Sequence, residues 1–305
     1  MLSTLKTRFD MYGPIPRLIF DWVVGGDLGG DRRVGRVFDL QRDILSLLGS
    51  AGTIFREQEN TLILMIPLRH QVEVQVGPSY YIKFATHYIA ARVGKAAFGY
   101  SNQAMDLYQT LLQFPNARPS AGWIFEGLMH GWLCKGGEFK TKHCESNETE
   151  VISLQKAIIF KGLSGLSILL RKEKHSREVN PDIAGVYLQP EIPNFPAADA
   201  LALLRADTVA WKIILFRMTL NTENEVKASA LDKVWGVLPK GIKESCQIYL
   251  VWVVREEPQS FPIQKVVGDT GGRWKEKLIQ CVLELKDTEL QPKFCPILFS
   301  LFASL

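Results

Sequence analysis

The sequence predicts an α/β protein in which helices flank a mixed β-sheet, preceded by a smaller, mostly helical region. Two observations indicate this class. Beyond residue 157, apolar runs rich in β-forming residues alternate with helical patterns, which is typical of strands interleaved with helices. The run from Ile248 to Val254 is apolar or aromatic throughout, so its strand must be covered on both faces. With 305 residues, of which 47% are hydrophobic, the chain is long enough for two domains.

The mostly helical region covers residues 1–117. Two prolines in Tyr12–Arg17 fix an extended turn, and the glycine-rich, charged stretch Gly25–Gly35 has the composition of a surface loop. The expected elements that follow are a helix at Leu40–Leu48, strands at Leu62–Ile66 and Val72–Val76, and helices at Tyr80–Phe98 and Gln103–Phe114. The segment Phe114–Ser120 then combines two prolines with small polar residues, so we expect a domain boundary at about residue 117.

The predicted α/β domain covers residues 118–305 and begins with a helix at Ala121–Cys134. The expected strands are Ala157–Phe160, Gly185–Leu188, Ala198–Leu204, Val209–Leu220 and Gln247–Val254. Between the last two strands, Ala228–Leu238 has helical spacing and is closed by Pro239. This order of elements is what places the helices on the faces of a mixed sheet.

Charge and cysteine content exclude several classes of protein. The 36 basic and 32 acidic residues leave a net charge of only +4, so a contact with nucleic acid would need a local basic patch. The five cysteines contain no Cys-x-x-Cys pair, which argues against a disulfide framework and fits a reducing compartment. They are Cys134, Cys144, Cys246, Cys281 and Cys295.

The ends of the chain predict an intracellular protein of the cytoplasm or nucleus, without membrane contact. The first ten residues show no apolar core of a secretory signal. The apolar tail Phe294–Leu305 is far shorter than the roughly 20 residues that a membrane-spanning helix needs.

The helix expected at Ala121–Cys134 is apolar around most of its circumference, except for a narrow stripe that carries Glu126 and His130 one turn apart. This stripe is either a metal-binding or proton-handling group in a cleft, or a face turned to solvent.

A second candidate is Asp199, a carboxylate at the start of an otherwise apolar strand. A charge in that place is costly unless it is paired or bound to a metal. The next expected strand brings Arg217 within reach, so an ion pair between Asp199 and Arg217 is the structural alternative.

A zinc site is a further alternative, because four candidate ligands lie within fifteen residues: His130, Cys134, His143 and Cys144. Their spacing fits no common zinc finger. The other interpretation is a buried helix cysteine followed by an exposed loop.

Several short motifs follow one another along the chain. They are YGPIPR at Tyr12–Arg17, GWIFEGLMH at Gly122–His130, NFPAAD at Asn194–Asp199, LFRMT at Leu215–Thr219, then Leu238-Pro239 and Ile248–Val254. In this order they resemble the crinkler and retrotransposon-hot-spot (RHS) proteins of fungi, oomycetes and trypanosomes. In that group a P-loop ATPase precedes a helical lid with a Tyr-Gly-x-x-Pro-Arg motif and a domain related to PD-(D/E)XK restriction endonucleases. The resemblance implies that residues 1–117 are lid-like and that residues 118–305 have a restriction-endonuclease-like fold.

Carried over to this sequence, the resemblance assigns Glu126 as the helix acid, with His130 in the same motif, and Asp199 as the central metal-binding carboxylate. Two carboxylates on Mg²⁺ are what hydrolysis of a phosphodiester requires. In the resembling proteins the third part of the metal site lies on the next strand and should read Gln-x-Thr. The chain has Arg217-Met218-Thr219 instead, and a cation at that place repels Mg²⁺. Asn224 replaces an expected histidine. Lys212 or Lys227 is a candidate substitute for the missing group.

The expected function is therefore a degenerate nuclease-like domain that acts as a nucleic-acid or protein interaction module. The alternatives are an active Mg²⁺-dependent nuclease that uses Glu126 and Asp199, and a truncated gene remnant without a selected function. No Gly-x-x-x-x-Gly-Lys-Ser/Thr motif occurs in the chain, so the resemblance also implies that the ATPase either lies on a separate partner chain or was lost.

Overall fold

The computed structural model describes residues 63–67, 80–84, 101–113, 117–172, 179–191, 195–205, 210–255 and 261–285. Its internal contacts divide the chain into two units, Met1–Leu128 with Leu290–Leu305, and Met129–Glu289. The division falls within the helix α8 (Arg118–Leu133), which is the first helix after the boundary that the sequence predicts.

In the first unit, strands β1 (Ile63–Pro67) and β2 (Tyr80–Phe84) pair antiparallel, with Ile63 opposite Phe84. The predicted strand at Leu62–Ile66 is thus confirmed. The predicted helix at Tyr80–Phe98 is wrong over Tyr80–Phe84, because this aromatic segment finds a strand partner in β1, and pairing of this kind overrides a helical spacing.

Two helices complete the described part of the first unit, α7 (Ser101–Leu112) and the first part of α8. They confirm the helices predicted at Gln103–Phe114 and Ala121–Cys134. The rings of Tyr108 on α7 and Phe125 on α8 stack with centroids 5.8 Å apart, so the two helices pack together. The elements predicted between residues 1 and 61, at Val72–Val76 and in the tail at Phe294–Leu305 lie outside the described residues, and the mostly helical character of residues 1–117 stays a prediction.

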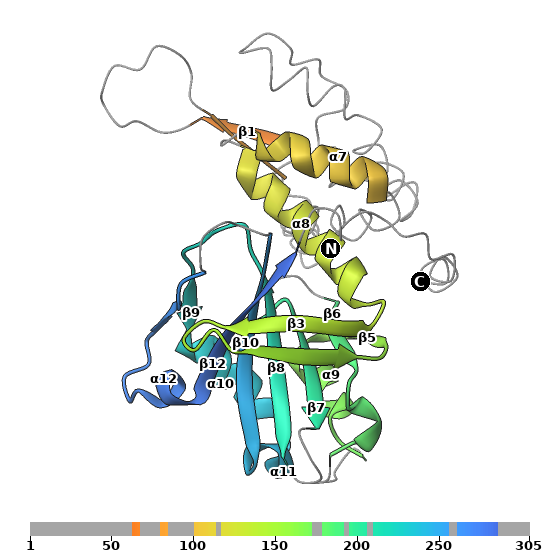
Figure 1. Ribbon diagram of the computed structural model, residues 1–305, viewed down its shortest axis with the longest axis vertical. Coiled ribbons are helices and arrows are strands. Elements are labelled where there is room, and N and C mark those ends of the chain that lie inside the picture. Colours follow the sequence, from red (N-terminus) through yellow and green to blue (C-terminus); the bar gives the residue numbers. More distant parts are fainter. Residues whose placement is uncertain are drawn as a thin grey trace, which may run out of the picture. The chain divides into compact units, whose positions relative to one another are not determined.

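The second unit is built on an eight-stranded mixed sheet with the order β4-β3-β12-β10-β8-β7-β6-β5 (Figure 1). The strands are β3 (Gly137–His143), β4 (Thr149–Leu154), β5 (Ala157–Phe160), β6 (Tyr187–Pro190), β7 (Ala200–Arg205), β8 (Trp211–Met218), β10 (Cys246–Arg255) and β12 (Leu278–Leu285). The neighbours β8, β10 and β12 run parallel, whereas β7 runs antiparallel to β8. This confirms the predicted fold class, an α/β protein with a mixed sheet flanked by helices.

Helices cover one face of this sheet. The helical elements are α9 (Gly162–Leu169), the short 3-10 helix η2 (Pro181–Ile183), α10 (Ala228–Val237), α11 (Lys240–Lys243) and α12 (Arg273–Lys277). Two short strands, β9 (Glu225–Lys227) and β11 (Lys265–Val267), pair beside them. Leu166 of α9 and Leu231 of α10 join Leu215 and Trp252 of the sheet in one buried cluster. Alternation along the strands assigns Leu215 and Trp252 to the face that α9 and α10 cover.

The sheet is curled, because its two edge strands are consecutive in the chain. Only Gln155 and Lys156 separate β4 at one edge from β5 at the other. The hairpin of β3 and β4 crosses the other strands in Figure 1. Accordingly Glu150 of β4 contacts Lys212 of β8, although three strands lie between these two in the order of the sheet.

Candidate functional site

Asp199, Arg217 and Thr219 lie at one edge of the sheet. Since β7 runs antiparallel to β8, the beginning of β7 and the end of β8 meet there. Asp199 directly precedes β7, and Thr219 directly follows β8. The carboxyl ends of parallel strands are where open α/β sheets commonly bind ligands, so this edge is a candidate site on topological grounds as well.

Backbone hydrogen bonds fix Asp199. Its N–H donates to the carbonyl oxygen of Phe216 at 2.8 Å, and its carboxylate Oδ2 accepts the N–H of Met218 at 2.7 Å. Ala197, two residues earlier, has φ 65°, a left-handed conformation that costs a residue with a side chain about 1 kcal/mol. The surrounding structure therefore holds this turn in place and delivers Asp199 to the end of β8.

Arg217 lies near Asp199 at this edge. The regular register ends where Ala200 pairs with Phe216, and the N–H of Asp199 donates to the carbonyl oxygen of that same Phe216, so Asp199 lies just outside the regular pairing. Its carboxylate accepts the N–H of Met218, the residue that follows Arg217 in β8. Asp199 and Arg217 are both half-buried. In the described parts of β7 and β8 no ion pair joins the two side chains, so the ion-pair alternative raised from the sequence is not the arrangement found.

Thr219 is buried and closes the turn after β8. Its Oγ1 accepts the N–H of Asn221 at 3.0 Å and donates to Oδ1 of Asn224 at 3.2 Å. Asn224, at the place where the resemblance expects a histidine, therefore has a structural task. Thr219 positions the loop here and does not present its hydroxyl to solvent.

Gln264 holds this loop against the segment before β11. It is 5% exposed, its Nε2 donates to the carbonyl oxygens of Thr222 at 2.9 Å and Pro262 at 2.6 Å, and its Oε1 accepts the N–H of Asn224 at 2.5 Å. Gln280 of β12 continues the network, since its Oε1 accepts the backbone N–H of Gln264 at 2.9 Å.

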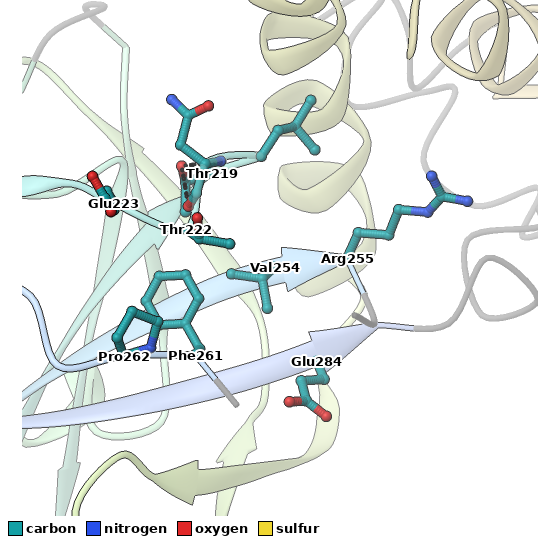
Figure 2. A pocket seen from close by; sticks show the side chains of 10 residues that line it. Thr219, Thr222, Glu223, Val254, Arg255, Phe261, Pro262 and Glu284 are labelled. Atoms are coloured by element: carbon teal, nitrogen blue, oxygen red, sulfur yellow. Dashed lines mark hydrogen bonds between the residues drawn. The ribbon is translucent and has the colours of Figure 1, made fainter. Parts of the chain in front are cut away.

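The two tied segments form the walls of a pocket of about 220 Å³ (Figure 2). It is lined by Thr219, Leu220, Asn221, Thr222, Glu223, Val254, Arg255, Phe261, Pro262 and Glu284. In Figure 2, Val254 and Arg255 lie at the end of β10 and Glu284 near the end of β12. Neither Asp199 nor Arg217 is among the described residues that line the pocket, so the pocket adjoins the pair without enclosing it.

The structure places His130 beside Tyr187. The Nδ1 of His130 lies 2.7 Å from the hydroxyl of Tyr187, whose ring packs against Phe216 with centroids 5.7 Å apart. The grouping of His130 with Asp199 stays a prediction. Glu126 belongs to the first unit, and its convergence with Asp199 stays a prediction.

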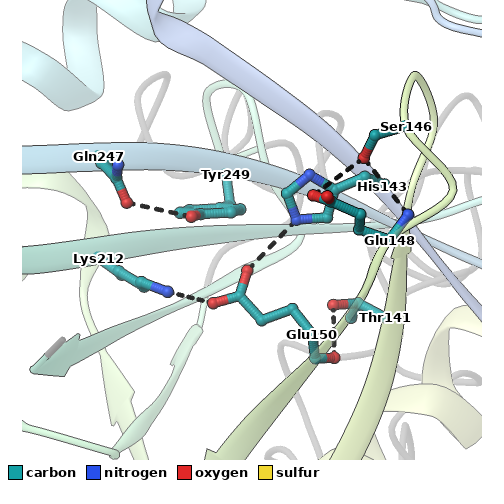
Figure 3. Close-up of polar contacts among 8 residues, drawn as sticks. All are labelled: Thr141, His143, Ser146, Glu148, Glu150, Lys212, Gln247 and Tyr249. Atoms are coloured by element: carbon teal, nitrogen blue, oxygen red, sulfur yellow. Dashed lines mark hydrogen bonds and ion pairs between the residues drawn. The ribbon is translucent and has the colours of Figure 1, made fainter.

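A polar cluster on the inside of the curl was not predicted (Figure 3). Glu150 of β4 forms an ion pair with Lys212 of β8, and its other oxygen lies 3.5 Å from Nε2 of His143. The Lys212 ammonium also lies 5.4 Å from the centre of the Tyr249 ring. Burial alone would lower the pKa of Lys212, but the hydrogen bond that its ammonium donates to Glu150 and the nearby negative charges raise it overall. Burial, followed by the charge of Glu150, raises the pKa of Tyr249.

This position of Lys212 excludes it as the substitute for the missing catalytic group. Lys212 and Arg217 are five residues apart in β8, about 17 Å, and they point to opposite faces. Lys227 is exposed, at the point where β9 passes into α10.

We expect Lys212→Met to lower the free energy of unfolding of the full chain by about 1–2 kcal/mol. Removing one partner of a fully buried pair costs more, but these side chains remain 23% and 24% exposed. Urea unfolding of Lys212→Met, Glu150→Met and the double variant measures the coupling, which should be about 1 kcal/mol. Additive single effects would contradict a stabilising pair.

Three of the four candidate zinc ligands have separate partners. His130 contacts Tyr187, His143 contacts Glu150, and the thiol of Cys134 donates to Oε1 of Gln189 at 3.7 Å. Burial raises the pKa of Cys134 to about 12 and, together with the charge of Glu145, that of Cys144 to about 11, which disfavours the thiolate that binds metal. Across the described ranges, no three His, Cys, Asp or Glu side chains are grouped to hold a metal ion.

Among the described helices none has the length and apolar character needed to cross a membrane.

Comparisons of the chain with protein-family models, with curated proteins and with solved structures find no match.

Proposed function

We propose that residues 129–289 are a nuclease-like domain of the crinkler or RHS type that binds nucleic acid at the edge carrying Asp199 and Arg217 and does not cleave it. One observation carries this proposal. The carboxylate of Asp199, just before β7, is held by the N–H of Met218, and Arg217 is the residue that directly precedes Met218 in β8.

The chemistry of this pair suits a phosphate better than a metal ion. Arg217 directly precedes Met218, whose N–H the carboxylate of Asp199 accepts, so its guanidinium contributes a positive potential near the place where a Mg²⁺ ion on Asp199 would sit. Arginine is a preferred donor to phosphate oxygens, because its planar N–H groups match two of them at once. A single carboxylate with a guanidinium nearby does not fit Mg²⁺, and we assign no hydrolytic step to the ion.

The proposal predicts that the full chain leaves supercoiled plasmid intact in the presence of Mg²⁺, whereas Arg217→Gln binds Mg²⁺ about tenfold more tightly than the natural chain. The gain corresponds to about 1.4 kcal/mol, a modest share of the repulsion from one nearby positive charge. Titration calorimetry with MgCl₂ measures it, and the matched control is the double variant Asp199→Asn, Arg217→Gln, which should lose the gain.

Cleavage by the natural chain that Asp199→Asn abolishes would instead show an active nuclease. Equal Mg²⁺ affinity of the natural chain and Arg217→Gln would contradict the assigned role of Arg217. If plasmid is neither cleaved nor retarded in a gel, the binding function proposed here is wrong, and a gene remnant or a protein-binding module is favoured.

A further inference from the structure

A half-exposed tryptophan surrounded by cations lies at the end of α10. Three cationic groups approach the ring of Trp235, with Arg273 5.2 Å, Lys277 5.3 Å and Lys243 5.9 Å from its centre. We call these four residues the Trp235 patch. They come from three elements, α10, α11 and α12, which are labelled near one end of the sheet in Figure 1.

The elements beneath the Trp235 patch are firmly anchored. Trp274, 2% exposed, packs edge-on against Trp235 at 5.9 Å, and its Nε1 donates to Asp232 at 3.1 Å. The carboxylate of Asp269 accepts the N–H groups of Trp274 and Lys275 at 2.8 and 3.0 Å, which caps the beginning of α12. Because α12 is fixed at both points, Arg273 and Lys277, four residues apart, remain beside the same indole.

The patch has an excess of positive charge that its neighbours do not neutralise. Asp232 lies 3.5 Å from Arg273 in an exposed pair, which contributes little. In the described part of the chain, neither Lys243 nor Lys277 forms an ion pair; the ammonium of Lys243 donates to the carbonyl oxygen of Gly236 at 3.2 Å. Three cations around one ring repel one another, and this repulsion is relieved when an anion binds between them.

The Trp235 patch is separate from the edge that carries Asp199. Its residues lie near the beginnings of β10 and β12, because α11 and α12 immediately precede these strands. Asp199 and Thr219 lie at the opposite ends, roughly 30 Å away by the length of β10. A ligand on the patch is therefore a second contact.

We infer that the Trp235 patch binds single-stranded nucleic acid. Phosphates would neutralise the three cations, and an unstacked base would lie on the indole, the combination on which sequence-tolerant binding of single strands depends. A duplex offers the phosphates but keeps its bases stacked inside. An acidic peptide offers negative charges, but it does not supply a flat aromatic ring with each charge as a nucleotide does. This inference rests on the contacts of the patch and does not require the nuclease-like assignment.

The test is fluorescence anisotropy of the full chain with a labelled oligo-dT of about 20 nucleotides, longer than the usual site size. Trp235→Leu, which keeps an apolar side chain but removes the flat ring, should weaken binding at least about tenfold. Lys277→Gln and Lys243→Gln should each lower the slope of log affinity against log salt by about 0.7. The matched control is Lys233→Gln, an exposed lysine of α10 that makes no ring contact among the described residues and should leave the slope unchanged.

The inference is overturned if Trp235→Leu, shown to be folded by circular dichroism, binds oligo-dT as the natural chain does, or if a duplex of the same length binds as tightly. The duplex result counts against the patch when Trp235→Leu weakens duplex binding as much as it weakens oligo-dT binding, because the edge with Asp199 can bind a duplex as well. The inference is also overturned if the lysine variants keep the full salt slope. Asp199→Asn and Arg217→Gln serve as the second control. If only those two variants lose oligo-dT binding, the inference about the Trp235 patch is wrong and the proposed function is supported. Mg²⁺ calorimetry tests the proposed function without involving the patch.

Discussion

Trp252→Ala is expected to lower the free energy of unfolding of the full chain by about 4 kcal/mol, the usual range for deleting a large buried aromatic side chain. Trp252 is fully buried in β10, between β8 and β12. Its ring packs against Phe261 at 5.7 Å, and its Nε1 donates to Oε1 of Gln280 at 3.1 Å. Alanine leaves a cavity between the sheet and its covering helices that the paired strands cannot close. Urea unfolding, followed by circular dichroism, measures the loss.

Two control variants separate the loss of the buried ring from smaller or unrelated changes. Trp252→Phe keeps most of the ring volume, and Oε1 of Gln280 still accepts the N–H of Gln264, so we expect a loss of about 1–2 kcal/mol. Ile168→Ala removes an aliphatic side chain that is 61% exposed and should change stability by less than about 0.5 kcal/mol. A loss below about 1 kcal/mol for Trp252→Ala would mean that the sheet is not packed around Trp252 as described.

Gln264→Met is expected to cost about 3 kcal/mol, although it preserves the shape of the side chain. Three backbone groups lose their partners at once, the carbonyl oxygens of Thr222 and Pro262 and the N–H of Asn224, and each unsatisfied buried group costs about 1–3 kcal/mol. The total stays near the lower end because loops can admit water. Urea unfolding gives the magnitude.

Hydrogen exchange distinguishes this loss from a general loosening of the fold. Exchange in Gln264→Met should accelerate first in residues 219–224 and 261–264, the two walls of the pocket. Gln247→Met is the matched control, because Gln247 is exposed and its Oε1 accepts only the hydroxyl of Tyr249, at 3.1 Å. If both variants lose stability equally, the network around Gln264 does not hold the loop.

Strands that consist of a continuous apolar run are the ones that the sequence predicts. The long apolar run around Ile248–Val254 became β10, since a strand buried on both faces has no polar alternation to obscure it. Residues Ala157–Phe160 became the edge strand β5. The strand β3, with the sequence GEFKTKH, was not predicted because it has one large apolar residue, Phe139, and draws its stability from β4 and β12. Such pairing is a property of the whole sheet, and local composition does not reveal it.

Part of the candidate site was equally predictable. A lone carboxylate at the start of an apolar strand indicated Asp199, and the spacing to the next strand indicated that Arg217 comes near it, at the end of β8. Glu150 was not predicted, because its partner Lys212 is 62 residues away and reaches it only through the curl of the sheet. The hydrogen bonds that fix the loop of Thr219 were not predicted for a similar reason, since Gln264 follows 45 residues later.

The position of β12 in the sheet sets an order of assembly on the ribosome. The β3 and β4 hairpin leaves the ribosome early, yet β3 joins the rest of the sheet through β12, whose Cys281 pairs with His143 about 140 residues upstream. At roughly 5–20 residues per second, translation reaches that partner on the order of ten seconds later. During this interval the hairpin has a free edge, and a chaperone that covers nascent strands would act between the synthesis of β4 and that of β12.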